Sequence, residues 1–128
     1  MSYLKALKTC DIISLHCPLN SKTQGMINKE SLSLMKPNAI LLNTARGGLI
    51  NEKDLADALN NNQIYAAGID VLTEEPPQAD NPLIATKNCF ITPHFAWASF
   101  SARERLMKIL LANIKAYIDG APINNVAQ

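Results

Sequence analysis

The sequence predicts an α/β fold built on a parallel sheet. Four short apolar runs have the length of strands, and segments with helical spacing lie before, between and after them. Few polar residues interrupt the runs, which is typical of parallel strands that are covered on both faces. Strands that alternate with helices form βαβ units, whose right-handed crossovers make neighbouring strands parallel.

Length and composition fit one ordinary folded domain. The chain has 128 residues, of which 48% are hydrophobic and 18% are charged, so it can bury a core and is not a disordered segment. Its 12 basic and 11 acidic residues are scattered and give a net charge of +1. Because no basic stripe is present to neutralise phosphates, we expect no nucleic-acid partner and no binding to an anionic membrane.

Targeting and metal signals are also missing from the sequence. The longest apolar run is shorter than the roughly 20 residues that span a bilayer, and the N-terminus has no signal-peptide core. The three cysteines are an odd number without a C-x-x-C motif, and two histidines are too few for an imidazole metal centre. We therefore expect a cytoplasmic protein with reduced thiols, no metal and no membrane span.

The first half of the chain contains two predicted strands. Residues 2–10 have helical spacing, and residues 11–17 are predicted to form a strand that Pro18 ends. A polar loop follows, and Asn28 is predicted to cap a short helix that stops near Pro37. Residues 39–42, all apolar, form the second predicted strand.

The second half continues the alternation. Asn51 is a suitable cap for a helix whose first turn contains acids, and an asparagine run at residues 60–62 ends it. Residues 65–71 are the third predicted strand, and their small side chains indicate close packing. After a polar loop with three prolines, residues 89–92 form the fourth strand, which Pro93 ends.

A long amphipathic helix is predicted over residues 99–119. Ser101 and Glu104 fit a capping box at its start, and Gly120 followed by Pro122 marks its end. Such a helix is about 30 Å long, which is long for a helix that covers so small a sheet. We expect it to pack on a partner that lies outside this chain.

Residues 43–48, Asn-Thr-Ala-Arg-Gly-Gly, are the first candidate for a binding site. They follow the predicted strand 39–42, so Arg46 would lie at the carboxyl end of a parallel strand, where ligands bind in open α/β sheets. The planar guanidinium matches a carboxylate or phosphate, and the glycines allow a tight turn. The alternative is that Arg46 pairs with a neighbouring surface carboxylate and that the glycines only make the turn.

Further candidates follow the other strands and would meet Arg46 at the same edge. Asp70 and Glu75 are acids, and the unperturbed pKa of a histidine such as His94 lies near neutrality. A carboxylate bonded to one imidazole nitrogen fixes the tautomer and leaves the other nitrogen for proton transfer. Each residue also has a structural alternative. His94 would be a structural histidine whose hydrogen bonds are satisfied, Glu75 and Glu74 would be a pair of acids in solvent, and Asp70 would cap a turn. His16, within the first predicted strand, is expected to be structural.

Four motifs together resemble the D-2-hydroxyacid dehydrogenases. They are Leu-His-Cys-Pro-Leu at residues 15–19, the stretch 43–48, Gly-Ile-Asp-Val at 68–71 with Glu-Glu-Pro at 74–76, and Thr-Pro-His at 92–94. Their order and spacing match over nearly the whole chain. Phe-Ala-Trp-Ala at 95–98 is most similar to the glycerate dehydrogenase (hydroxypyruvate reductase) branch.

The resemblance implies a role for each candidate residue. Arg46 would hold the carboxylate and keto oxygen of a small 2-hydroxy or 2-keto acid, His94 would donate the proton, and Glu75 would tune His94. Asp70 would meet the nicotinamide end of NAD, and NADP stays open because the acid that reads the ribose hydroxyl would lie outside this chain. Four more residues would line the nicotinamide and its ribose: Cys17, Pro18, Thr44 and Ala45.

By the same resemblance, residues 1–128 correspond to the C-terminal half of a Rossmann-type NAD-binding domain. The substrate domain and the G-x-G-x-x-G unit that binds the pyrophosphate are absent, so we expect an oxidoreductase fragment that is inactive alone. An exposed strand edge and helix stripe would favour a homo-oligomer. One alternative is a non-catalytic remnant that serves as a dimerisation or folding unit. Another is a hydrolase that uses His94 and Glu75, for which the sequence offers no evident nucleophile.

Overall fold

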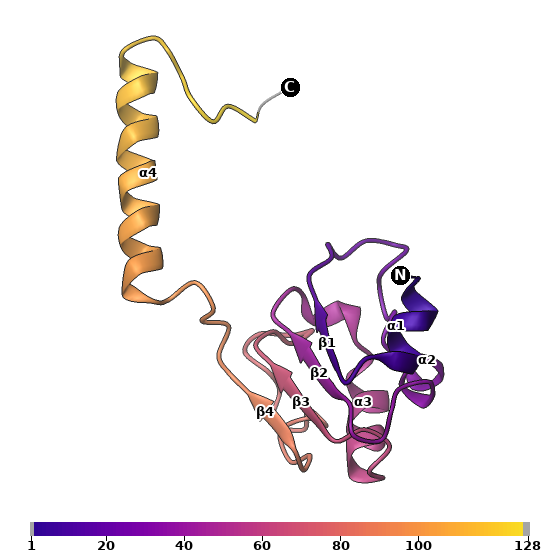
Figure 1. Cartoon of the computed structure of the whole chain (residues 1–128). Helices are drawn as coiled ribbons and strands as arrows, with labels where there is room; N and C mark the ends of the chain where they lie inside the picture. The colour runs from indigo at the N-terminus through magenta and orange to yellow at the C-terminus, as the bar shows by residue number, and fades with distance from the viewer. Residues whose placement is uncertain (1, 127–128) are drawn as a thin grey trace. The chain divides into compact units, whose positions relative to one another are not determined.

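The computed structural model describes residues 2–126, which divide after His94 into two compact units (Figure 1). In these described residues, the first unit contains a four-stranded sheet and three α-helices, and the second contains one long helix. All the predicted candidate residues fall in the first unit.

The sheet is parallel throughout. Its strands are β1 (Ile12–Leu15), β2 (Ile40–Asn43), β3 (Ala66–Ile69) and β4 (Cys89–Ile91), and they lie side by side in that order (Figure 1). The last residues of the strands face one another across the sheet, Leu15 with Asn43, Asn43 with Ile69, and Ile69 with Ile91. The predicted α/β fold is confirmed, and the four carboxyl ends share one edge.

Three helices accompany the sheet: α1 (Tyr3–Thr9), α2 (Lys29–Ser33) and α3 (Glu52–Asn60). The predicted caps are present, because Asn28 accepts a hydrogen bond from the Ser31 amide and Asn51 accepts one from the Asp54 amide, both at 3.1 Å. A 3-10 turn, η1 (Gly47–Leu49), links β2 to α3.

The two faces of the sheet differ in burial. On one face, Leu41 and Ala67 are buried and contribute to a core with apolar residues of all three helices, such as Leu7, Leu32, Leu55 and Leu59. On the other face, Ile12 and Phe90 are 61% and 68% exposed. A βαβ chain that adds each strand on the same side places its crossover helices on one face, which explains the difference.

The structure differs from the prediction in two strand ends and in the cap of the long helix. Strand β3 ends at Ile69 and β1 at Leu15, each two residues before the predicted end. His16 therefore lies beyond β1 and is exposed, with its Nε2 2.7 Å from Ser14 Oγ. The long helix is α4 (Phe100–Ile118), and its cap is Ser99, whose hydroxyl accepts from the Ala102 amide at 3.3 Å. A capping box at Ser101 and Glu104 is excluded because both lie within the helix.

Helix α4 buries none of its side chains within the described chain. Glu104 and Lys108 form an ion pair along the helix, with Oε1 2.9 Å from Nζ, and Gly120 follows the end of the helix with a φ of 75°. Among residues 2–126, no helix is long and apolar enough to cross a membrane, and no group of three His, Cys, Asp or Glu could hold a metal ion.

Two neighbouring residues in the long loop between β3 and β4 provide a test of the core. Leu83 is 1% exposed and Ile84 is 52% exposed. We predict that Leu83→Ala lowers the free energy of unfolding by about 2–5 kcal/mol, whereas Ile84→Ala changes it by about 0.5 kcal/mol or less. Urea unfolding of the two variants measures both effects, and equal losses would contradict the placement of Leu83 in the core.

Candidate active site

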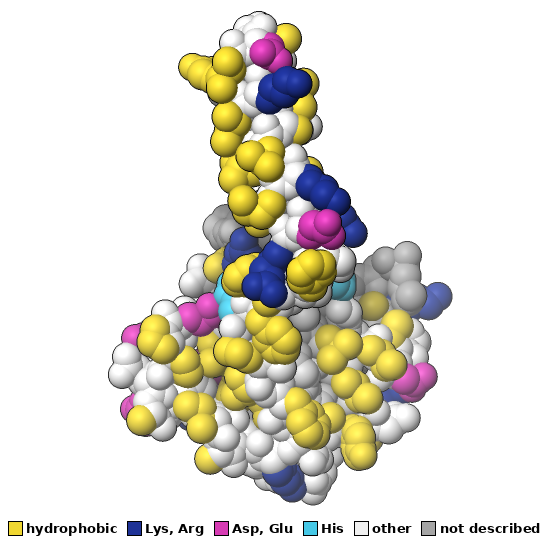
Figure 2. Space-filling model, turned by 90° about the vertical axis from the view of Figure 1, so that its left-hand side faces the viewer, with side chains coloured by type: hydrophobic (Ala, Val, Ile, Leu, Met, Phe, Trp, Pro, Cys, Tyr) yellow, Lys and Arg dark blue, Asp and Glu magenta, His cyan; other side chains and the backbone are white. Residues whose placement is uncertain are grey.

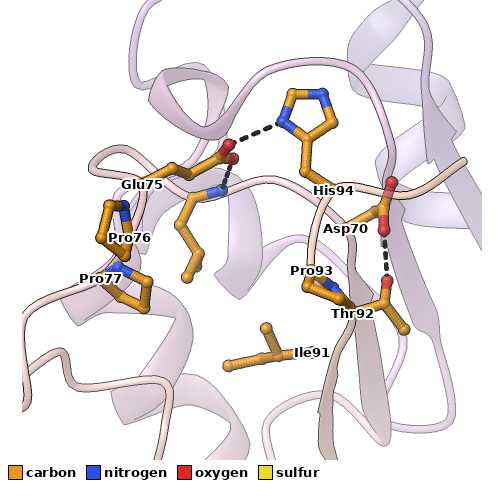
Figure 3. A pocket seen from close by; sticks show the side chains of 9 residues that line it. Asp70, Glu75, Pro76, Pro77, Ile91, Thr92, Pro93 and His94 are labelled. Carbon is orange, nitrogen blue, oxygen red and sulfur yellow. Dashed lines mark hydrogen bonds and ion pairs between the residues drawn. The ribbon is translucent and has the colours of Figure 1, made fainter. Parts of the chain in front are cut away.

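A cavity of about 380 Å³ lies at the carboxyl edge of the sheet (Figure 3). Apolar side chains supply much of its wall, and two acids, a histidine and a threonine supply its polar groups. The lining residues are Asp70, Leu72, Glu75, Pro76, Pro77, Ile91, Thr92, Pro93 and His94. Three of the predicted site residues therefore share one cavity.

The side chains of Glu75 and His94 point toward each other across this cavity (Figure 3). Glu75 Oε2 lies 2.7 Å from His94 Nδ1, and Glu75 Oε1 accepts a hydrogen bond from the Leu72 amide at 2.9 Å. The hydrogen bond from His94, followed by that from Leu72, lowers the pKa of the Glu75 carboxyl. Glu75 is therefore an ionised, oriented partner for the imidazole, and a proton on Nδ1 fixes the tautomer of His94.

His94 follows β4 in an unusual backbone conformation. Its φ is 50°, and its amide donates to the Thr92 carbonyl at 3.0 Å. A non-glycine residue pays about 1–2 kcal/mol for this left-handed conformation. Such strain collects at functional sites because the surrounding structure holds it in place. At His94 the conformation belongs to the tight turn that brings the imidazole to Glu75.

Asp70 and Thr92 form a second polar pair in the cavity. Asp70 is the first residue after β3 and is 6% exposed. Its Oδ1 accepts a hydrogen bond from the Thr92 hydroxyl at 2.5 Å (Figure 3). Sequence reasoning did not assign a role to Thr92, although the pairing of Ile69 with Ile91 places the two residues side by side. Its hydroxyl holds the Asp70 carboxylate in one orientation.

Arg46 lies at the same sheet edge but does not line the cavity. The fully buried Asn43 holds the loop that contains Arg46. The side-chain amide nitrogen of Asn43 donates to the Arg46 carbonyl at 2.9 Å, and its side-chain oxygen accepts from the Ala45 amide at 3.1 Å. The exposed guanidinium donates from Nη1 to the Ala45 carbonyl at 2.6 Å. In the described part of the chain, no carboxylate forms an ion pair with Arg46.

Gly47 joins the Arg46 loop to the loop that contains Glu75. A Cβ at Gly47 would lie 2.0 Å from the Leu72 carbonyl carbon and 2.3 Å from the Thr73 nitrogen. Only glycine allows the two backbones to approach this closely. The contact therefore fixes Arg46 and Glu75 relative to each other through their main chains.

The other predicted cofactor contacts lie on the loops after β1 and β2, outside the cavity. Cys17 is half-buried, with its Sγ 3.7 Å from Met26 Sδ, and Ala45 is also half-buried. Pro18 and Thr44 are exposed. The structure thus gathers Asp70, Glu75 and His94 and leaves these four residues, like Arg46, along the same edge of the sheet.

Residues 1–96 match the sequence profile of the D-isomer specific 2-hydroxyacid dehydrogenase, NAD binding domain. The chain belongs to this family. The predicted resemblance is thereby confirmed, as is the Rossmann-like NAD-binding fold. The profile includes every candidate site residue.

Individual relatives agree with this assignment. The chain is 49% identical to a hydroxypyruvate reductase of Blautia hydrogenotrophica over 120 residues and 45% identical to a glycerate dehydrogenase of Methylorubrum extorquens over 122 residues. Each match includes 94% of this chain but only 37% and 39% of the respective relative. The similarity to the glycerate dehydrogenase branch is confirmed, and this chain spans less than half the length of these relatives.

The fold of the whole chain also has a counterpart among solved structures. A D-lactate dehydrogenase with NAD⁺ from Lactobacillus jensenii superposes with a TM-score of 0.90 at 34% identity. The superposition includes 100% of this chain and 42% of that enzyme.

Substitution of the two adjacent glycines tests the contact between the loops. We predict that Gly47→Ala lowers the free energy of unfolding by about 1–3 kcal/mol or more, because its methyl group meets rigid backbone. Gly48→Ala should cost less, because its Cβ would meet the end of the Leu19 side chain at 2.9 Å, which can rotate away. Denaturant unfolding compares the two variants. A greater loss for Gly48→Ala would show that the loops do not meet at Gly47.

Proposed function

We propose that this chain provides the acid–base residues and part of the cofactor site of an NAD-dependent D-2-hydroxyacid dehydrogenase that reduces a small 2-keto acid such as hydroxypyruvate. The observation on which this proposal rests is the 2.7 Å contact between Glu75 and His94 in a cavity at the carboxyl ends of parallel strands. The names of the two relatives, hydroxypyruvate reductase and glycerate dehydrogenase, support the substrate.

The cavity suits the nicotinamide end of the cofactor. Leu72, Ile91 and Pro93 give it an apolar wall of the kind that packs on a flat ring, and the oriented Asp70 carboxylate can accept from a carboxamide N–H. Bound NADH supplies the hydride that reduces the keto carbon. Cys17, Pro18, Thr44 and Ala45 line the nicotinamide and ribose in this proposal, consistent with their place along the same sheet edge.

His94 is the proposed proton donor. As the keto carbon gains a hydride, the carbonyl π electrons move to the oxygen, which takes the proton of the imidazolium and becomes the alcohol. His94 is left neutral, and a proton from solvent restores it. The Glu75 carboxylate stabilises the imidazolium before transfer and keeps the ring in place, because its own two oxygens are both hydrogen-bonded.

Arg46 is the proposed anchor for the substrate carboxylate. Its guanidinium now donates to the carbonyl of its own neighbour, Ala45, and is otherwise exposed. A carboxylate offers it a bidentate, charge-assisted pair, which is stronger than one bond to a neutral carbonyl. In this proposal the side chain therefore turns toward the substrate, while Asn43 and Gly47 keep its backbone fixed.

We further propose that residues 1–128 form the C-terminal half of the NAD-binding domain and that turnover requires the segments this chain does not contain. Its span of 37–39% of the relatives supports this division. We also propose a cytoplasmic location, which the three unpaired cysteines support.

A chimera tests the proposed function. This chain replaces the matching segment of the Blautia hydrogenotrophica hydroxypyruvate reductase, and NADH oxidation with hydroxypyruvate is measured. We predict that the chimera turns over and that His94→Ala lowers its kcat by about 100- to 10,000-fold. Glu75→Gln should also lower kcat, because the imidazolium loses its carboxylate partner.

Glu74→Gln is the matched control for Glu75→Gln. Glu74 neighbours Glu75, but its carboxylate accepts from Gln78 at 2.6 Å and does not line the cavity. Its substitution should leave kcat within about twofold, since it holds neither substrate nor imidazole. A folded chimera without turnover would favour the alternative of a non-catalytic folding or dimerisation unit.

We propose that the isolated chain self-associates through its exposed apolar surface. Figure 2 shows hydrophobic side chains along α4, where Leu106, Leu110 and Ile114 are 59%, 46% and 47% exposed. Apolar surface of this kind gains free energy when it is removed from water. In sedimentation velocity, the average sedimentation coefficient should rise with concentration, and Leu110→Lys should weaken the rise. A monomer at every concentration would contradict this proposal.

A further inference from the structure

Glu75 is placed by a loop that contains no regular secondary structure. This loop runs from residue 70, after β3, to residue 88, before β4. Residues 73–80 are exposed, so burial alone does not hold the segment around Glu75. A loop of this length needs specific contacts to keep one conformation, because ordering each residue costs about 1–2 kcal/mol in entropy.

Glu52, the first residue of α3, makes two such contacts. Its Oε1 accepts a hydrogen bond from the Thr73 amide at 2.7 Å, and its Oε2 accepts one from Asn81 Nδ2 at 2.8 Å. The two donors lie on either side of Glu75 in the sequence. Hydrogen bonds to a carboxylate are stronger than those between neutral groups. One side chain on a helix therefore fastens both ends of the segment that contains Glu75.

The far end of this segment is fixed to the core. Asn81 Oδ1 accepts a hydrogen bond from the Leu83 amide at 2.9 Å, and the Leu83 side chain is buried. At the near end, Thr73 follows Leu72, whose amide donates to Glu75 Oε1 at 2.9 Å. Any shift of the Thr73 amide would thus move the neighbouring Leu72 amide, which orients the Glu75 carboxylate.

Capping does not explain the position of Glu52. Asn51 already caps α3 by accepting from the Asp54 amide at 3.1 Å. An acid in the first turn gains some free energy from the helix dipole, but both oxygens of Glu52 are directed to the loop instead of the helix amides. The geometry is that of a clamp between α3 and the loop.

We infer that Glu52 is a positioning residue, which clamps the loop at Thr73 and Asn81 and so sets Glu75 in place against His94. That this placement serves catalysis rests on the proposed function. The clamp itself is a property of the 128-residue chain and can be measured without turnover.

The experiment uses the full 128-residue chain and two NMR readouts. In Glu52→Ala, the pKa of the Glu75 carboxyl should rise toward its ordinary value, because the displaced loop weakens the bonds from His94 and Leu72 that lower it. Hydrogen exchange of the Thr73 amide should become about tenfold faster, as expected when a bond to a charged acceptor is lost. Exchange in β2 and β3 should stay unchanged.

Three further variants separate the clamp from general effects. Glu30→Ala removes an exposed acid from the first turn of α2 and should change neither readout. Glu52→Gln keeps an acceptor for Thr73 but places an amide NH₂ against that of Asn81, so it should raise the pKa of Glu75 only partly. In the double variant with Glu52→Gln and Asn81→Asp, the side-chain amide at position 52 donates to the carboxylate at position 81, which reverses the direction of the native hydrogen bond. Both readouts should then return toward those of the wild type.

An unchanged pKa of Glu75 and unchanged exchange at Thr73 in Glu52→Ala would overturn the inference. So would a uniform loss of protection that includes β2 and β3, because it would show that Glu52 supports the whole unit instead of the loop. If both readouts change as expected while the His94→Ala chimera keeps its turnover, the clamp stands and the proposed acid–base role of His94 fails.

Discussion

The contact between Glu75 and His94 joins two loops that regular secondary structure does not hold. Strands β3 and β4 are parallel neighbours, and their last residues, Ile69 and Ile91, are paired. The chain therefore leaves both strands at the same edge of the sheet, which makes the contact possible. From there, His94 reaches the cavity through a turn with positive φ, and Glu75 reaches it from a long loop. The sheet brings the loops together, and hydrogen bonds fix their final positions.

Carboxyl and amide side chains do most of this fixing, and each forms two hydrogen bonds to the loop that it holds. Asn43 holds the Arg46 loop, and Glu52 holds the loop of Glu75. Gly47 then brings the two loops into direct backbone contact. Removing a polar group from water costs free energy unless the group forms a hydrogen bond in the protein. These side chains therefore favour the one loop geometry in which they are bonded.

The sequence predicted the order of the elements and the sheet edge along which the candidate residues lie, because those features depend on periodicity and on local caps such as Asn28 and Asn51. It could not predict the hydrogen bond between Asp70 and Thr92, or those that Glu52 makes, since their partners lie more than twenty residues apart. The cap of α4 was misplaced because Ser99 and Ser101 are both plausible caps, and the backbone decides between them.

The residues of the candidate site argue against the alternative of a hydrolase. Covalent hydrolysis needs an activated nucleophile beside the base. Burial raises the pKa of Cys89 in β4 to about 11, so its thiol stays protonated and unreactive near neutral pH. The Ser99 hydroxyl is engaged as the cap of α4. What the cavity does offer is an imidazole oriented by a carboxylate beside an apolar wall, an arrangement that suits proton donation during hydride transfer and requires no nucleophile from the protein.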